Sequence, residues 1–366
     1  MTDTVMPATI TTESPDITRR EKVLVGMSGG LDSTISALLL REQGYDVEGA
    51  AIIMHDHTDI GGARRSAEEL GVALHIIDAR ERFKEAVMRP FAEEYMRGLT
   101  PNPCVFCNPA VKFAALHDYA RAHGFHRIAT GHYAFVDCQS GRYFIRRAAS
   151  SKKDQSYALW GLSQDQLSML ILPLGTHDKE KLREHAASLG LSAAQSGESQ
   201  EICFIPDGDY VEWLKREHGY QPHEGDFVDE DGNVLGRHRG VAFYTIGQRK
   251  GLGLSLGRPM YVSAIDPERN TITLSPPGGE YMSCALLEGL NFQLLDPGAL
   301  PERLYAEVRI RYSAPPVPAE ITFTETGGVL RAEVVFKSPA RAVTPGQSAV
   351  AYDGDKLLFG GYIKRG

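Results

Sequence analysis

The chain has 366 residues, more than twice a typical domain of about 150 residues, so it is expected to form several domains. Hydrophobic residues make up 42% and charged residues 23%, which excludes a collagen-like fibre, a coiled coil and a wholly disordered chain. No apolar run approaches the roughly 18 residues that a membrane helix needs, and five cysteines are too few for a disulfide scaffold. A cytoplasmic protein without membrane contact is therefore expected.

The N-terminal segment and two basic stretches differ from the average composition of the chain. Residues 1–20 are rich in threonine and have no continuous apolar region, which predicts a flexible tail and not a secretory signal. The net charge of −8 argues against nucleic-acid binding, yet the stretches 142–153 and 233–258 contain basic residues and no acidic ones. Each basic stretch is either an ordinary solvated face or a surface for an anionic polymer.

Apolar runs alternate with helical patterns in the first part of the chain. Short strands are predicted near 23–25, 50–54, 74–77 and 127–130, with helices at 31–43, 63–70 and 112–123 between them. The strands read as continuous apolar runs, which is typical of a parallel sheet covered on both faces. Ligands are then expected at the carboxyl ends of the strands.

The pattern changes after about residue 208. Asp231-Gly232 and Asp353-Gly354 are turn dipeptides between strand-like runs, and each predicts a β-hairpin. We therefore expect an α/β domain at 21–208, a small β-rich domain at 209–276 and a C-terminal β-barrel at 277–366.

The segment Gly26-Met27-Ser28-Gly29-Gly30-Leu31-Asp32-Ser33 lies between the first predicted strand and helix. Its glycines allow close approach of the backbone to a ligand, and N–H groups at a helix N-terminus attract anions. The spacing and lysine of the Walker loop are absent. The segment resembles the SGGxDS pyrophosphate loop of enzymes that cleave ATP to AMP and pyrophosphate, in which Asp32 would help to hold Mg²⁺.

Three cysteines occur in unusual settings. Cys104 and Cys107 follow Pro101 and Pro103, which predict a stiff connector and not a helix start, and Cys203 lies in SQEICFI. Three cysteines are short of a closed zinc site unless a histidine completes it, so redox or sulfur-transfer chemistry is favoured, with thiols activated by nearby positive charge. Cys138 and Cys284 lack such a setting and are predicted to be packed.

Eight motifs in order identify a resemblance that covers the chain from about residue 22 to its end. They are GMSGGLDS, TPNPCVFCN, ATGHY, KDQSY, SQEICFI, TIGQRKGLG, RIRY and TPGQSAV. Together they resemble the bacterial tRNA-specific 2-thiouridylase family of ATP pyrophosphatases. The resemblance implies an adenine nucleotide hydrolase-like α/β fold and ATP-dependent 2-thiolation of the wobble uridine of lysine, glutamate and glutamine tRNAs. It also implies an upstream persulfide or sulfide donor protein.

The resemblance assigns roles to residues at matching positions. Cys203 would carry a persulfide and Cys107 would be its nucleophilic partner, with a disulfide between them as one intermediate. ATP contacts would come from Gly26, Met27, Ser28, Gly29, Gly30, Leu31, Asp32, Ser33, Ile52 and Gly131. Contacts with tRNA would come from Asn102, Pro103, Cys104, His132, Lys153, Asp154, Gln155, Arg311, Tyr312 and Gln347, the first three at the target base.

Two departures from the family leave alternatives open. Many relatives have aspartate at the position of Cys104, so this chain has three thiols, Cys104, Cys107 and Cys203, that would suit a 4Fe–4S cluster with one iron open to sulfide. The segment between Met54 and Ala63 is shorter than usual, so contacts there are not transferred. A ligase or amidotransferase that shares the loop, and a non-catalytic RNA-binding protein, are the competing functions.

Overall fold

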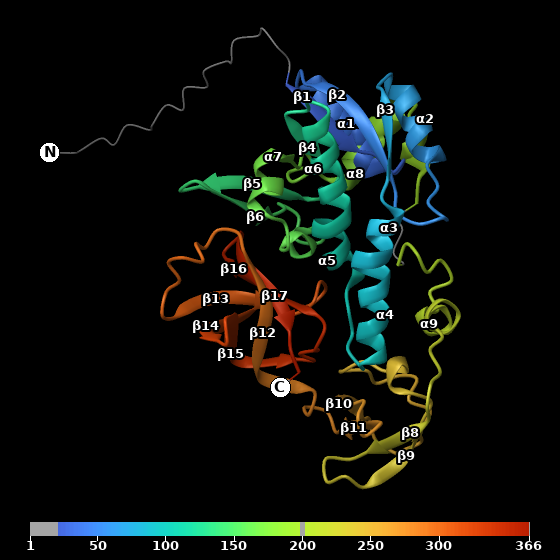
Figure 1. The fold of residues 1–366 in the computed structure, drawn as a ribbon, viewed down its shortest axis with the longest axis vertical. Coiled ribbons are helices and arrows are strands. Elements are labelled where there is room, and N and C mark those ends of the chain that lie inside the picture. The colour runs from blue at the N-terminus through green and yellow to red at the C-terminus, as the bar shows by residue number, and fades with distance from the viewer. Residues whose placement is uncertain (1–20, 198–201, 366) are drawn as a thin grey trace, which may run out of the picture.

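The computed structural model describes residues 21–197 and 202–365, so the predicted tail at 1–20 lies outside the described residues. An α/β part, blue to green in Figure 1, is followed by a smaller β-rich part in yellow and a barrel in orange and red. The predicted order of these three architectures is confirmed. The domain boundaries given above stay predictions.

A parallel sheet of five strands, ordered β3-β2-β1-β4-β7, forms the centre of the α/β part. The strands are β1 (Lys22–Gly26), β2 (Asp46–Ile53), β3 (Leu74–Asp78), β4 (Arg127–Ala129) and β7 (Leu170–Ile171). Val23 and Val25 of β1 pack on one face with α1 (Leu31–Glu42), α2 (Gly61–Leu70) and α8 (Lys179–Ser188). Leu24 packs on the other face with α6 (Phe113–Ala122). Burial on both faces explains the continuous apolar strands.

Two composite helices extend from the sheet. The first joins α3 (Arg80–Phe83) to α4 (Arg89–Met96) through a π-helical turn and reaches toward the yellow part in Figure 1. The second joins α5 (Pro103–Cys107) to α6 through a π-helical turn at Asn108–Lys112. Such turns are rare in proteins, and those that occur are often found at functional sites. This one follows Cys107 directly.

The prediction that Pro103 belongs to a non-helical connector is wrong. Pro103 occupies the first turn of α5, where its missing N–H removes no intrahelical hydrogen bond. Asn102 precedes it, and its side-chain oxygen accepts the N–H of Cys104 at 3.1 Å. An N-cap and a proline at the first helical position therefore start the helix that carries both cysteines.

The central part is a four-stranded sheet, and the C-terminal part is a closed antiparallel barrel. The central strands are β8 (Gly225–Val228), β9 (Val234–His238), β10 (Tyr261–Asp266) and β11 (Thr271–Ser275), preceded by α9 (Tyr210–His218). The barrel strands are β12 (Tyr281–Phe292), β13 (Leu304–Arg309), β14 (Val317–Thr326), β15 (Val329–Arg341), β16 (Ser348–Asp353) and β17 (Lys356–Ile363), with β12 paired to both β15 and β17. Both predicted hairpins, β8–β9 and β16–β17, are confirmed.

A hairpin from the α/β part extends the sheet of the barrel. Its strands are β5 (Ala134–Gln139) and β6 (Arg142–Arg147), and Arg146 pairs with Lys356 of β17. The helix α7 (Gln164–Met169) follows this hairpin. Among the described residues, no helix is both long enough and apolar enough to cross a bilayer.

Candidate active site

The loop at Gly26–Ser33 joins β1 to α1 and is held by its own hydrogen bonds. The N–H of Ser28 donates to Ser33 Oγ at 3.2 Å, and the Ser33 hydroxyl donates to the Gly30 carbonyl at 3.0 Å. Gly29 has φ +81°, and a Cβ there would lie 2.2 Å from the carbonyl carbon of Gly62 at the start of α2. Only glycine fits this close approach, so packing against the start of α2 by itself requires a glycine at position 29.

A cavity of about 270 Å³ opens beside the loop at the carboxyl ends of β1, β2 and β4. Seven of the ten residues predicted to contact ATP line it: Gly26, Met27, Ser28, Asp32, Ser33, Ile52 and Gly131. Gly30 and Leu31 line a second, adjoining cavity. The position agrees with the rule that ligands of parallel sheets bind beyond the carboxyl ends of the strands.

Asp32 at the start of α1 has two partners that the sequence analysis missed. Lys179 Nζ and the Tyr133 hydroxyl each donate to its carboxylate at 2.9 Å. The Lys179 side chain is only 15% exposed, so this cation is held inside the site. Lys179 is the first residue of α8, distant in sequence from every motif, and no local pattern distinguishes it from a surface lysine.

The adjoining cavity of about 820 Å³ is strongly basic. Among the residues that the structure describes, lysine and arginine side chains line it together with one carboxylate, that of Asp32; they are Lys112, Lys152, Lys153, Lys179 and Arg183. Six of the predicted tRNA contacts line this cavity: Asn102, Cys104, His132, Lys153, Gln155 and Tyr312. A basic cavity with an aromatic side chain suits an unstacked base and its phosphates.

Ser196 was also missed by the sequence analysis. Its hydroxyl oxygen accepts the N–H of Leu31 at 3.1 Å, at the start of α1. Arg183 donates to the carbonyls of Ala194 and Ser196 at 2.5 and 3.2 Å. These contacts attach the segment that follows α8 to the pyrophosphate loop.

The three thiols of the predicted sulfur chemistry differ in exposure. Cys104 and Cys203 are exposed, whereas Cys107 is buried with its Sγ 3.7 Å from Met54 Sδ. Burial raises the pKa of Cys107 to about 11. The pKa of Cys203 is raised as well, because its sulfur is partly desolvated by the surrounding chain although the residue as a whole is exposed, and because Cys104 lies nearby. Lys112 opposes both shifts, and Cys104 and Cys203 add to the shift of Cys107. The expectation of thiols activated by nearby charge is therefore not met, because burial outweighs Lys112.

Two further predictions concern the cysteines. All five cysteines, which lie within the described part of the chain, are free, so the disulfide between Cys107 and Cys203 is not formed here. Cys138 on β5 and Cys284 on β12 are exposed, so the prediction that they are packed is wrong. Both lie in parts of a strand that are exposed as a whole, the end of β5 and the start of β12, so nothing packs over them.

The raised pKa of Cys107 gives a direct prediction. With a pKa of about 11, only about 10⁻³ of the Cys107 population is thiolate at pH 8. Iodoacetamide reacts with the thiolate and not with the thiol. Alkylation of Cys107 is expected to be at least ten times slower than that of exposed Cys138, and to accelerate between pH 8 and 11. Peptide mapping by mass spectrometry measures both rates, and equal rates at pH 8 would disprove the burial argument.

His132 separates the two cavities and lines both. Its Nδ1 lies 2.9 Å from Thr130 Oγ1, and burial lowers its pKa to about 3. The imidazole is therefore neutral throughout the physiological range, and with Nδ1 paired to Thr130 it offers a ligand only Nε2, as a donor or an acceptor according to its tautomer.

The barrel holds the segment that leads into α5. Gln347 Nε2 donates to the Thr100 carbonyl at 2.7 Å, and the Thr100 N–H donates to the Pro345 carbonyl at 3.0 Å. Gln347, predicted as a tRNA contact, does not line either cavity. In this structure it positions the chain two residues before Asn102.

Gly346, between these two contacts, gives a stability prediction. It has φ +91°, and a Cβ would lie 2.9 Å from the Thr100 nitrogen. Gly346→Ala is expected to lower the free energy of unfolding by about 1–3 kcal/mol more than Gly354→Ala, the cost of overpacking. Gly354 also has positive φ but open space around it, so it controls for backbone strain. Urea denaturation measures the difference, and equal losses would contradict the close packing.

Asp154, Arg311 and Pro103 complete the predicted tRNA contacts, and none of them lines the basic cavity. Asp154 is buried and accepts hydrogen bonds from Arg309 Nη1 at 2.9 Å and from the Ser156 hydroxyl at 3.0 Å. Arg311 donates to the Ile246 carbonyl at 2.9 Å and to Thr344 Oγ1, and burial lowers its pKa. In this arrangement, Asp154 and Arg311 join parts of the protein to one another.

The glycine-rich loop, its cavity and the adjoining basic cavity define a nucleotide-binding α/β domain of the ATP pyrophosphatase class joined to a barrel. Family models match three successive segments. They are the tRNA methyl transferase HUP domain at residues 21–207, the tRNA methyl transferase PRC-barrel domain at 212–276 and the aminomethyltransferase beta-barrel domain at 289–363.

Curated relatives match almost the whole chain. The tRNA-specific 2-thiouridylase MnmA of Carboxydothermus hydrogenoformans is 44% identical over 96% of this chain and 99% of its own length. That of Clostridioides difficile is 42% identical over 94% of this chain and 98% of its own. The chain belongs to the tRNA-specific 2-thiouridylase family.

Solved structures resemble the chain more weakly. The U34-tRNA thiolase NcsA from Methanococcus maripaludis, solved with its 4Fe–4S cluster, is 21% identical with a TM-score of 0.33. The match covers 54% of this chain and 66% of that one.

Proposed function

We propose that this protein catalyses the ATP-dependent 2-thiolation of the wobble uridine in lysine, glutamate and glutamine tRNAs. One observation carries the proposal. The cavity of about 270 Å³ beside the loop, called here the nucleotide cavity, and the basic cavity share Ser28, Asp32 and Ser33 of the loop. A base in the basic cavity therefore lies beside the site for ATP. Because tRNA and its modification are cytoplasmic, the reaction is assigned to the cytoplasm.

Adenylation would be the first step. The C2 oxygen of an extruded uridine attacks the α-phosphate of ATP, pyrophosphate leaves, and the oxygen becomes part of an AMP ester that sulfur can displace. The N–H groups of the loop and the Lys179 cation favour the departing negative charge. Asp32 keeps unused lone pairs beside Lys179 and would hold Mg²⁺, which neutralises the same charge.

Sulfur transfer would follow from Cys203. Its terminal persulfide sulfur attacks C2 and displaces AMP, which leaves a disulfide link between the base and Cys203. The Cys107 thiolate then attacks Cys203 Sγ, releases 2-thiouridine and forms a Cys107–Cys203 disulfide, which an external dithiol reduces. Because burial holds the Cys107 pKa at about 11 here, this step requires a local rearrangement or loss of its proton to an acceptor.

A route through a 4Fe–4S cluster is the alternative for the same thiols. Among the described residues, no three His, Cys, Asp or Glu side chains form a group suited to a metal ion, and Cys107 Sγ faces Met54. The three thiols do not fit a cluster in this arrangement, so no step is assigned to it. Anaerobic purification followed by iron analysis separates the two routes.

The proposal is tested by incubating the protein with ATP, Mg²⁺, a protein-bound persulfide and unmodified glutamate tRNA. Formation of 2-thiouridine at position 34 with equal amounts of AMP and pyrophosphate is expected. A ligase or amidotransferase would instead release AMP without RNA, and an RNA-binding protein would release none.

A further inference from the structure

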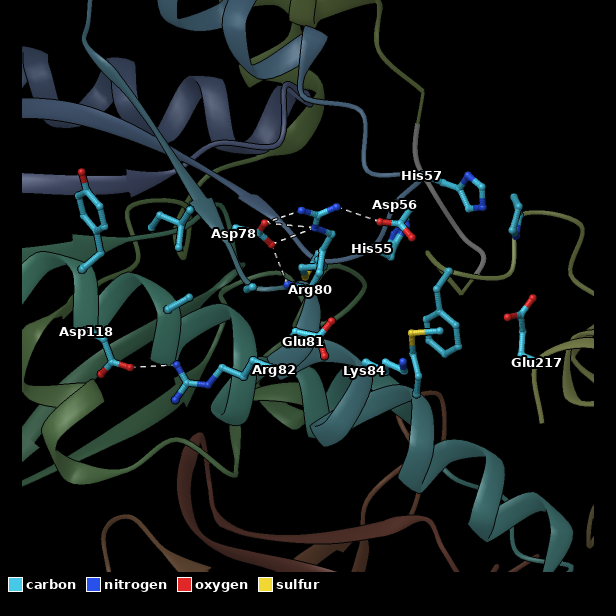
Figure 2. Close-up of a pocket in the computed structure, with 18 of the residues that line it drawn as sticks. His55, Asp56, His57, Asp78, Arg80, Glu81, Arg82, Lys84, Asp118 and Glu217 are labelled. Carbon is cyan, nitrogen blue, oxygen red and sulfur yellow. Dashed lines mark hydrogen bonds and ion pairs between the residues drawn. The ribbon is translucent and has the colours of Figure 1, made fainter.

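A third cavity, of about 1230 Å³, is shown in Figure 2. Its walls come from the ends of β2 and β3, from α3 and α6, and from α9. Met54 lines both this cavity and the nucleotide cavity, and its Sδ contacts Cys107 Sγ. Neither the predicted ATP contacts nor the predicted tRNA contacts line it.

The cavity adjoins the segment that carries Cys203. Phe204 and Pro206 line it, and Cys203 precedes them as an exposed thiol. Phe204 itself is buried in an aromatic cluster with Phe83 and Trp213, at ring distances of 5.4 and 5.1 Å. This cluster fixes the chain directly after Cys203 against the wall of the cavity.

Charge distinguishes this cavity from the basic one. Six carboxylates line it against four lysine and arginine side chains; the carboxylates are Asp56, Asp78, Glu81, Asp118, Asp207 and Glu217. Arg80 pairs with Asp78 at 2.6 Å and with Asp56 at 3.0 Å, Arg82 pairs with Asp118 at 2.9 Å, and Arg216 pairs with Glu217 at 2.8 Å. These pairs leave the acidic excess of the lining in place, with Glu81 and Asp207 outside them. Figure 2 shows Glu81 from α3 and Glu217 from α9 at separate places around the cavity. A net acidic lining repels RNA and attracts a basic partner.

We propose that this cavity receives a basic, cysteine-bearing segment of the protein that delivers sulfur to Cys203, an inference that rests on the proposed function. The tRNA and the sulfur donor then approach from cavities of opposite charge. The volume exceeds the 300–1,000 Å³ typical of small-molecule sites, which favours a peptide segment over a free low-molecular-weight persulfide.

The transfer itself balances without an added oxidant or reductant. The Cys203 thiolate attacks the terminal sulfur of the donor's cysteine persulfide, and the bond between the two donor sulfurs breaks. Cys203 becomes the persulfide, and the donor cysteine leaves as a thiolate.

Two synthetic pentapeptide persulfides test the inference, one with lysine and one with glutamate at both ends around a central persulfidated cysteine. Persulfide on Cys203 is measured by mass spectrometry at low salt, without tRNA or ATP. The basic peptide is expected to load Cys203 at least about tenfold faster than the acidic one. The double variant Glu81→Lys/Glu217→Lys should reduce this ratio to about one or below.

The matched control is Glu325→Lys/Glu333→Lys, which changes the net charge equally at exposed positions on barrel strands β14 and β15. It should keep the parental ratio. Equal loading by the two peptides in the parent protein, or an unchanged ratio in Glu81→Lys/Glu217→Lys, overturns the inference. Release of pyrophosphate with tRNA and ATP needs no sulfur, so it tests the proposed function separately.

Discussion

Cys203→Ser is expected to reduce tRNA thiolation at least about 1,000-fold, the scale of loss when a covalent nucleophile is removed. A serine hydroxyl cannot carry a persulfide, so the adenylated uridine has no sulfur to receive. Release of pyrophosphate in the first turnover should stay within about twofold of the parent, because Cys203 does not line the nucleotide cavity. Quench-flow assays with labelled ATP and nucleoside analysis measure the two steps separately.

The matched control for Cys203→Ser is Cys138→Ser. Cys138 is also exposed but lies on β5, and it lines neither the nucleotide cavity nor the basic cavity. The Cys138→Ser variant should thiolate tRNA at the parental rate. Thiolation by Cys203→Ser within tenfold of the parent would remove Cys203 from the reaction.

Lys179→Met is expected to slow tRNA-dependent release of pyrophosphate about 100- to 1,000-fold, as for removal of one group that stabilises transition-state charge. The substitution removes the cation beside Asp32 and leaves that carboxylate without its 2.9 Å ion pair. Single-turnover rates with saturating tRNA measure the effect. Lys179→Arg should retain more activity than Lys179→Met, since it keeps the charge.

Lys181→Met provides the comparison on the same helix, because Lys181 is exposed and lines neither the nucleotide cavity nor the basic cavity. Lys181→Met should release pyrophosphate at the parental rate. If Lys179→Met also releases pyrophosphate at the parental rate, the pairing of Lys179 with Asp32 is structural only, and the Lys179 cation does not assist the departure of pyrophosphate.

The fold was predictable where local pattern and burial agree. The runs around Val23–Val25 and Ile128 are apolar throughout because both faces of the sheet are covered. These runs made it possible to predict a parallel α/β fold. The loop at Gly26–Ser33 was predictable from its motif, and one of its glycines, Gly29, is required by the close approach of Gly62. The two hairpins were predictable from their Asp-Gly turns, because Gly232 and Gly354 adopt the positive φ that such turns require.

The site was less predictable where it depends on contacts between distant segments. Lys179 reaches Asp32 across 147 positions of sequence, and Gln347 reaches Thr100 across 247. Nothing in the sequence near either residue encodes its partner. The ionisation of Cys107 was missed for the same reason, since its pKa follows from burial beside Met54 and not from the neighbouring residues in TPNPCVFCN.

The proposed reaction requires that the wobble uridine enters the basic cavity beside the pyrophosphate loop. Photo-crosslinking of glutamate tRNA with 5-iodouridine at position 34, in the presence of a non-hydrolysable ATP analogue, measures this directly. Crosslinks to residues 102–108, His132 or Tyr312 are predicted. Crosslinks confined to the acidic cavity or to the outer face of the barrel would contradict the account.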